Sequence, residues 1–288
     1  MTGAASTAQA QPRERCFHRA VLSPPARRRQ AHSEQVGQIL DAGLDLVTGS
    51  RCAGCSRPGR TLCPACREQL TRMQPRLSRP DPLPPLLAGL TLMSAGPYDG
   101  LVRELIVAHK ERRRLALARD LGRLLAVVTE AALASVTGPG AAVALVPVPS
   151  APAATRARGH DPLLRITRVA AVRLRRRGTE CTVARLLHQR RLVADQAGLS
   201  AAARAANLDG ALVVRKTDAV ANRDSAVLGD RQVLVVDDVV TTGASLAAAV
   251  SALRAAGHPP QAGVTLAATA RRIQPVTESS MAAGVKDR

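Results

Sequence analysis

The sequence has almost no aromatic residues: its 288 residues include one Tyr, one Phe and no Trp. Leu, Val, Ile and Ala must therefore fill any hydrophobic core. Proteins that bind single-stranded nucleic acid without sequence preference usually stack bases on aromatic side chains. Because Phe17 and Tyr98 are the only such rings, we expect any contact with nucleic acid to be made mainly to the backbone and to be sensitive to salt.

Long hydrophobic runs are also missing. No window reaches the roughly 18 uninterrupted apolar residues that a membrane-spanning helix needs. The N-terminal segment MTGAASTAQAQPRER has no apolar stretch of the kind that a secretory signal requires. We therefore predict a cytoplasmic protein with no membrane span. Its length and apolar content of 46% suit one large domain, or one domain with an appendage.

Acidic residues are scarce relative to basic ones. The chain has 22 Asp and Glu against 41 Lys and Arg, which gives a formal net charge of +19. This balance favours an anionic partner, either a phosphate-bearing substrate or nucleic acid. The alternative is that the abundant Arg and Ala reflect genomic base composition and that most Arg runs are solvated surface. Charge alone does not decide between the two.

The distribution of apolar and small residues divides the chain into five segments. Residues 1–34 lack an apolar period and are predicted to be a disordered tail. Residues 35–76 combine a helical pattern, from Val36 to Val47, with a cysteine cluster, and residues 77–89 form a Pro-rich linker. Residues 90–270 are predicted to be the main domain, and residues 271–288 a second disordered tail.

From residue 90 onward, short apolar runs alternate with longer amphipathic stretches. We expect strands at 90–94, 142–148, 183–187, 233–236 and 264–268. We expect helices at 100–109, 115–134, 162–176 and 245–256. This alternation favours an α/β fold, in which a mainly parallel sheet is flanked by helices.

Four of the six cysteines form two Cys-x-x-Cys pairs, which are Cys52 with Cys55 and Cys63 with Cys66. Two such pairs can direct four thiolates inward and complete the tetrahedral sulfur shell that zinc prefers. With no coordination position left open, the zinc would be structural. The alternatives are a redox dithiol, whose motif normally occurs once, and a pair of disulfides, which the lack of a secretory signal disfavours.

The most informative stretch is QVLVVDDVVTTGAS, residues 232–245. An apolar strand delivers Asp237 and Asp238 to its carboxyl end, the edge at which open α/β sheets bind ligands. Two adjacent carboxylates can accept hydrogen bonds from the 2- and 3-hydroxyls of a ribose. Backbone N–H groups at the start of a helix favour the binding of a phosphate. The helix start expected here consists of Thr241, Thr242, Gly243, Ala244 and Ser245. The pattern predicts a ribose 5-phosphate site, and the alternative is an acid pair that only caps a turn.

This stretch resembles the phosphoribosyl pyrophosphate (PRPP) signature of type I phosphoribosyltransferases. From about residue 36 to 268, the chain resembles the ComF family, also called the competence or GntX-like family. The cysteine pairs support this resemblance, as do LIVAHKERRR at 105–114, VPVP at 146–149 with RARGH at 156–160, and QAGLSAAARAAN at 196–207. The resemblance implies a type I phosphoribosyltransferase fold preceded by a small four-cysteine zinc module.

The resemblance also implies roles for individual residues. Asp237 and Asp238 would bind the ribose hydroxyls, and Thr241 to Ser245 would wrap the 5-phosphate. The candidates for pyrophosphate binding are Arg156, Arg158 and Gly159, with Lys110 as the second choice; an Arg fork can grip two phosphate oxygens. For the cations, the alternative is an ordinary solvated side chain. Magnesium would be bound by pyrophosphate and ribose oxygens, so no protein cage is expected. No catalytic residue is assigned.

The chain departs from the family pattern at two places. The family usually has Arg-Gly-Phe-Asn-Gln where this chain has RGHDP at 158–162, so no role of that Asn or Gln is carried over. Thr241 stands where enzymes that salvage hypoxanthine and guanine usually have Asp, which argues against that activity.

Three functions stay open at this point. The first is transfer of a phosphoribosyl group from PRPP to an unidentified acceptor, with release of pyrophosphate. The second is a non-enzymatic factor for DNA uptake that binds single-stranded DNA, and the third is a nucleotide-dependent regulator of transcription. The sequence does not identify the acceptor, and it leaves open whether the chain forms a homo-oligomer.

Overall fold

The computed structural model describes residues 51–137, 140–189, 212–214, 228–269 and 273–274. The expected tail at 1–34, the expected helix at 36–47 and the QAGLSAAARAAN motif at 196–207 lie outside these residues. So does most of the expected tail at 271–288. Within the described residues, no helix is both long and apolar enough to cross a membrane.

A seven-stranded sheet lies at the centre of the described chain, with the strand order β4-β3-β7-β8-β2-β1-β9. Its strands are β1 (Arg76–Ser78), β2 (Thr91–Ser94), β3 (Val143–Pro147), β4 (Cys181–Val183), β7 (Gln232–Val240), β8 (Ala262–Ala268) and β9 (Ile273–Gln274). The strands from β4 to β2 pair in parallel, whereas β1 is antiparallel to both β2 and β9. The predicted α/β fold with a mainly parallel sheet is confirmed.

Two hydrophobic clusters cover the two faces of the sheet, because successive side chains of a strand point to opposite sides. Val143 and Leu145 of β3 belong to one cluster, and Ala144 and Val146 belong to the other. Strands that are buried on both faces are expected to be continuous apolar runs. Every residue of β3 and β8 is buried accordingly.

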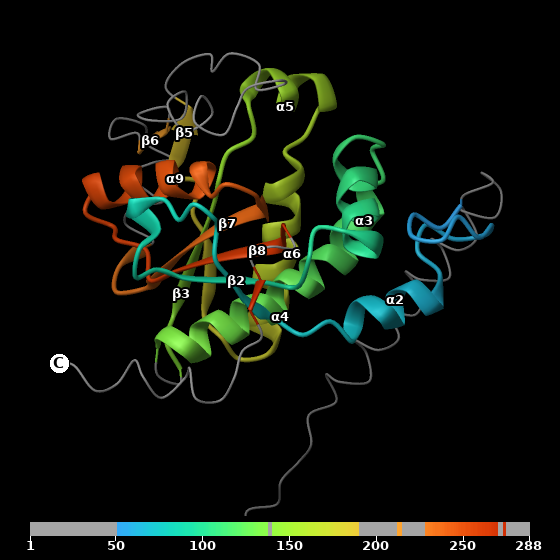
Figure 1. Cartoon of the computed structure of the whole chain (residues 1–288), viewed down its shortest axis with the longest axis horizontal. Helices are drawn as coiled ribbons and strands as arrows, with labels where there is room; N and C mark the ends of the chain where they lie inside the picture. The colour runs from blue at the N-terminus through green and yellow to red at the C-terminus, as the bar shows by residue number, and fades with distance from the viewer. Residues whose placement is uncertain (1–50, 138–139, 190–211, 215–227, 270–272, 275–288) are drawn as a thin grey trace, which may run out of the picture. The chain divides into compact units, whose positions relative to one another are not determined.

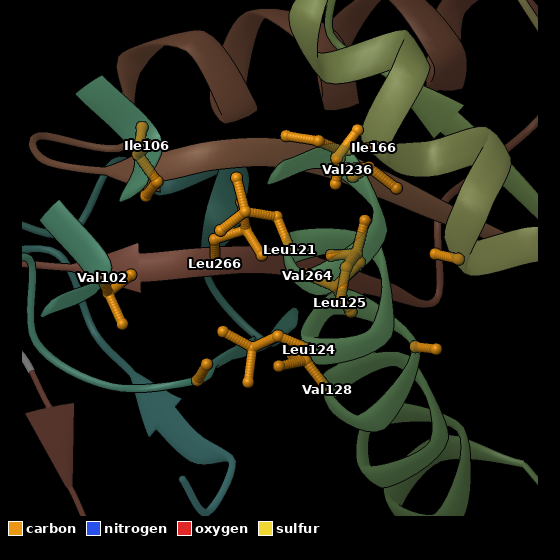
Figure 2. Packing of buried hydrophobic residues seen from close by; sticks show 14 of the residues in the cluster. Val102, Ile106, Leu121, Leu124, Leu125, Val128, Ile166, Val236, Val264 and Leu266 are labelled. Atoms are coloured by element: carbon orange, nitrogen blue, oxygen red, sulfur yellow. The ribbon is translucent and has the colours of Figure 1, made fainter. Parts of the chain in front are cut away.

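Helices flank both faces (Figure 1). The first face packs against α3 (Gly100–Lys110), α4 (Ala118–Val136) and α6 (Pro162–Arg176). Figure 2 shows leucines of α4 beside Val264 and Leu266 of the sheet and Ile166 of α6. The second face packs against α9 (Ala244–Ala255) and a separate hairpin of β5 (Leu187–Gln189) and β6 (Leu212–Val214).

Gly122 allows α4 and α6 to pack closely. A Cβ atom at this position would lie 2.6 Å from Cβ of Val169 and 2.9 Å from the carbonyl oxygen of Ile166. Real Cβ contacts are essentially never closer than 3.0 Å. Any larger residue at Gly122 would therefore push the two helices apart.

The elements differ from the sequence expectations in several places. The run expected as one strand at 183–187 is divided, because β4 ends at Val183 and the chain leaves the sheet to form β5. The helix expected at 115–134 starts as a 3₁₀ turn, η2 (Leu115–Leu117), and continues as α4. In the segment expected to be a tail, β9 extends the sheet by pairing with β1.

Residues 77–89 are more than a linker. Ser78 of β1 is buried, and its hydroxyl donates to Oγ of Ser94 at 2.7 Å. A 3₁₀ turn, η1 (Pro85–Leu87), places Leu87 in the second hydrophobic cluster. This segment therefore packs against the sheet and against the start of α9.

Candidate functional site

Asp237 and Asp238 lie near the carboxyl end of β7, which continues to Val240. The two residues are held together locally, because the backbone N–H of Asp238 donates to Oδ1 of Asp237 at 2.8 Å. The pKa of Asp237 is raised to about 8, first by burial and then by repulsion from the Asp238 carboxylate. This hydrogen bond and the positive charge of Lys110 act in the opposite direction and lower it. At neutral pH Asp237 is therefore largely protonated.

Lys110, the last residue of α3, reaches this acid pair from a segment 128 residues earlier in the chain. Its ammonium donates to Oδ2 of Asp238. Burial by itself would lower the pKa of Lys110, but the carboxylates of Asp238 and Asp237 outweigh it and raise this pKa, while Arg158 opposes them. We refer to Lys110, Asp237 and Asp238 as the acid–lysine cluster.

Arg158, at the end of the short helix α5 (Pro152–Arg158), lies near Lys110. Its Nη2 atom lies 3.2 Å from Oε1 of Glu111, the residue after Lys110. Gly159 follows with φ 75°, a left-handed conformation that ends α5 without the cost of a Cβ atom. The structure thus places Arg158 near the acid–lysine cluster, and it gives Gly159 the role of a helix C-cap.

The loop Thr241–Gly243 connects β7 to α9, which begins at Ala244. Gly243 has φ 76°, and a Cβ atom there would lie 2.9 Å from both Leu87 and Pro80. Only Gly combines this backbone conformation with such close packing. The first N–H groups of a helix have no partner within the helix, so those at the start of α9 can donate to an anion beside the acid pair.

Arg156 has different surroundings from Arg158. It lines a cavity of about 320 Å³ whose other walls come from the end of β3, the start of α6 and β5. The lining includes Pro147, Pro149, Ser150, Asp161 and Leu187, but neither Lys110 nor the two acids. Arg158 is not among the residues that line this cavity, so the two arginines have different neighbours.

Asp161, at one of the two departures from the family pattern, has a clear local role. Its Oδ1 atom accepts from the backbone N–H of Leu164 at 3.1 Å, and Oγ of Ser150 lies 3.4 Å away. The carboxylate thus caps the N-terminus of α6, where a negative charge is favourable. Pro162 at the first helical position reinforces this start.

Sequence reasoning missed His109 and Glu111, the neighbours of Lys110. The ring of His109 is fully buried, with carbonyl oxygens of Arg114 and Pro162 at 3.2 and 3.3 Å from its two nitrogens. Burial lowers the pKa of His109. This ring links the end of α3 to the start of α6, and no local sequence signal marks it or the pairing of Glu111 with Arg158.

The four cysteines predicted as ligands lie together. The Sγ atoms of Cys52, Cys55, Cys63 and Cys66 are all within 4.8 Å of one another. Those of Cys55 and Cys63 are 3.6 Å apart, close to the ~3.8 Å that tetrahedral Zn–S bonds of ~2.3 Å require. All five cysteines in the described residues have free thiols. The cluster can bind a metal such as zinc.

The protonation of the cluster also suits a metal. Burial would raise the pKa of Cys52, but backbone N–H groups of Cys63, Cys55 and Gly54 lower it to about 6. Burial and the neighbouring cysteines raise the pKa of Cys66. Without a cation, the four sulfurs cannot all be thiolates at neutral pH, so metal binding would release protons.

Two polar contacts attach this module to the rest of the described chain. Nε of Arg67, in α2 (Pro64–Thr71), lies 3.0 Å from Oδ1 of the buried Asp120 of α4. The guanidinium of Arg114 donates to the carbonyl oxygen of Arg51. The module is therefore fixed to the segment that follows Lys110.

Comparison with models of known protein families finds no match, and comparison with curated proteins finds no similar sequence.

Proposed function

We propose that this protein has a type I phosphoribosyltransferase fold of the ComF family, binds PRPP with magnesium and transfers its phosphoribosyl group to an acceptor. One observation carries the proposal. The acid pair of β7 continues directly into the loop and helix start of residues 241–245, and Lys110 and Arg158 lie beside it from two other segments.

Each part of PRPP has a counterpart in this arrangement. The ribose hydroxyls would donate to Asp237 and Asp238, and the 5-phosphate would accept from the hydroxyls and backbone N–H groups of residues 241–245. The pyrophosphate would lie toward Arg158, whose planar guanidinium suits two phosphate oxygens. Lys110, which bonds to Asp238 and lies near Arg158, could contact either the ribose or the pyrophosphate.

The reaction breaks the bond between C1 of the ribose and the pyrophosphate oxygen, which keeps the bonding electrons. A lone pair of the acceptor then forms the new bond to C1. Carboxylates that hold the ribose hydroxyls fix the orientation of the sugar. Cations beside the leaving group stabilise its growing negative charge. Magnesium, held by ribose and pyrophosphate oxygens, would supply further neutralisation of that charge.

The acceptor has a candidate location in the cavity beside Arg156. Its volume of about 320 Å³ is within the range of small-molecule sites. It lies at the carboxyl end of β3, the strand next to β7. Prolines and two leucines offer apolar contacts, while Arg156 and Asp161 offer charges of both signs, so the acceptor would be a small molecule with both polar and apolar groups.

The four-cysteine cluster is proposed to hold one structural zinc ion. Four thiolates suit zinc and leave no position for a substrate or an activated water. The ion would stabilise the short module formed by Arg51 to Thr71, which has few buried side chains of its own. Through Arg114, the module would also stabilise the segment that follows Lys110.

One observation favours the non-enzymatic alternative, a factor that binds single-stranded DNA. Helix α6 has four exposed arginines, which are Arg165, Arg168, Arg175 and Arg176. Such a helix can contact a phosphate backbone without aromatic stacking. Release of pyrophosphate in the presence of a candidate acceptor favours the enzyme, whereas salt-dependent DNA binding without turnover favours the alternative.

Calorimetric titration with PRPP and magnesium tests the proposal. The double change Asp237→Asn and Asp238→Asn keeps the size of both side chains but removes the charge-assisted hydrogen bonds of the Asp238 carboxylate, worth about 1.5–3 kcal/mol each. We expect PRPP affinity to fall at least tenfold while the double variant stays folded. Asp230→Asn, at an exposed position outside the sheet, is the matched control. Equal affinity of the double variant and the wild type would reject the proposed site.

A further inference from the structure

The proposed site contains an ion pair between two of its own residues. The ammonium of Lys110 bonds directly to Oδ2 of Asp238, and only 16% of the Asp238 side chain and 32% of the Lys110 side chain are exposed. Partial shielding from water makes this ion pair stronger than one on the open surface. In the free protein, Lys110 therefore occupies a carboxylate that the proposed function assigns to ribose.

Ribose hydroxyls and Lys110 compete for the same acceptor. Asp237 is the weaker acceptor of the two, because its Oδ1 already accepts the N–H of Asp238 and its raised pKa keeps it largely protonated at neutral pH. A ribose hydroxyl that donates to the Asp238 carboxylate therefore shares it with Lys110 and weakens their contact. A sugar that places no anionic group near Lys110 gives its ammonium no new partner to replace Asp238.

A pyrophosphate on C1 offers that exchange. Lys110 is the last residue of α3 and has a long flexible side chain, so its ammonium can move without moving the helix. It lies near enough to Arg158 for the two positive charges to repel. A pyrophosphate beside Arg158 would relieve this repulsion and attract both cations. Arg158 is similarly paired in the free protein, with the half-exposed Glu111.

We propose that Lys110 is a specificity-determining residue that couples the ribose and pyrophosphate parts of the site. Its ion pair with Asp238 disfavours ribose phosphates that lack pyrophosphate, and a pyrophosphate group draws Lys110 away and frees Asp238 for the ribose hydroxyls. This inference rests on the proposed binding of PRPP.

The test compares two ligands on Lys110→Met, which removes the charge and keeps a flexible apolar side chain. Affinities for PRPP and for ribose 5-phosphate, both with magnesium, are measured by calorimetry. We expect the affinity for ribose 5-phosphate to rise about threefold to tenfold, as expected for loss of a partly shielded competing ion pair. We expect the affinity for PRPP to fall at least about tenfold, because the pyrophosphate loses a charged partner.

Arg112→Met is the matched control. It removes one positive charge two residues away, where Arg112 is exposed and lies 3.9 Å from Glu104. The control should leave the ratio of the two affinities unchanged. Urea denaturation of each variant verifies that it is folded, and Lys110→Gln replaces Lys110→Met if the latter is not.

The opposite signs of the two changes distinguish this role from a structural one. A Lys110 variant that is folded and loses affinity for both ligands equally, or keeps both, overturns the inference while leaving PRPP binding in place. If the wild-type protein binds neither ligand, the proposed function itself fails, and the inference fails with it.

Discussion

Replacing Asp237 with Asn should stabilise the protein at alkaline pH. The pKa of Asp237 is about 8 in the folded protein, raised from 3.8 by burial and by the adjacent Asp238. The unfolded chain therefore releases this proton near pH 4, whereas the folded protein keeps it until about pH 8. Between these values the folded state binds more protons, so the wild-type free energy of unfolding falls as pH rises and levels off above pH 8.

The size of the effect follows from the two pKa values. One pKa unit corresponds to about 1.4 kcal/mol, so a shift of about four units sets an upper limit of about 6 kcal/mol. The amide oxygen of Asn still accepts the backbone N–H that Asp237 accepts at 2.8 Å. We expect Asp237→Asn to be about 2–5 kcal/mol more stable than the wild type at pH 9, and close to it at pH 4.

Urea denaturation at pH 4, 7 and 9 measures this difference. Because variant and wild type are compared at each pH, the titration of other groups, such as the buried His109, cancels. Asp230→Asn, at an exposed position, should track the wild type throughout. If the stability difference between Asp237→Asn and the wild type does not change with pH, Asp237 is ionised in the folded protein at neutral pH and the reasoning is wrong. The same variant should bind PRPP more weakly, as expected where function and stability make opposing demands.

Three further predictions concern other parts of the described chain. Purified protein should contain about one zinc ion, and Cys66→Ser should reduce the metal content and the stability, whereas Cys181→Ser should keep the metal; a folded, metal-free wild type by elemental analysis would contradict this. Arg158→Lys should weaken PRPP much more than ribose 5-phosphate in calorimetric titrations; a parallel loss would mean that the loop is displaced. Gly243→Ala should cost about 1–3 kcal/mol in urea denaturation and more than Gly257→Ala, since both have positive φ but only Gly243 is crowded; equal costs would show that crowding contributes nothing.

The elements that sequence patterns predicted best are those with strong local signals. The expected helix at 162–176 has the observed bounds of α6, because Asp161 caps it, Pro162 starts it and basic residues fill its last turn. The buried strands were visible as apolar runs, which is typical of a parallel sheet covered on both sides. The four-cysteine cluster was also predictable, because the two cysteines of each pair are only three residues apart in the sequence.

The features that the sequence could not predict depend on contacts between distant segments. Nothing near Lys110 or Asp238 indicates that their side chains meet across 128 positions of sequence. Similarly, the prolines in 77–89 predicted a linker. In the structure, β1 pairs with β2 of the sheet, and Leu87 packs in the hydrophobic cluster that contains α9. Arg156 and Arg158 are two residues apart but project into different surroundings, because the turn of a helix separates neighbours at that spacing.

The charged side chains of the proposed site are paired with one another. The chain has a formal net charge of +19, but Lys110 is paired with Asp238, Arg158 with Glu111, and Asp237 is largely protonated at neutral pH. Because these charges nearly balance, an anionic ligand gains affinity by exchanging ion-pair partners and only weakly by overall attraction. Exposed arginines of α6 would instead attract any polyanion through counterion release. Raising the salt concentration should therefore weaken DNA binding steeply and PRPP binding only slightly, and equal salt slopes for the two ligands would show that PRPP, too, binds to the open basic surface.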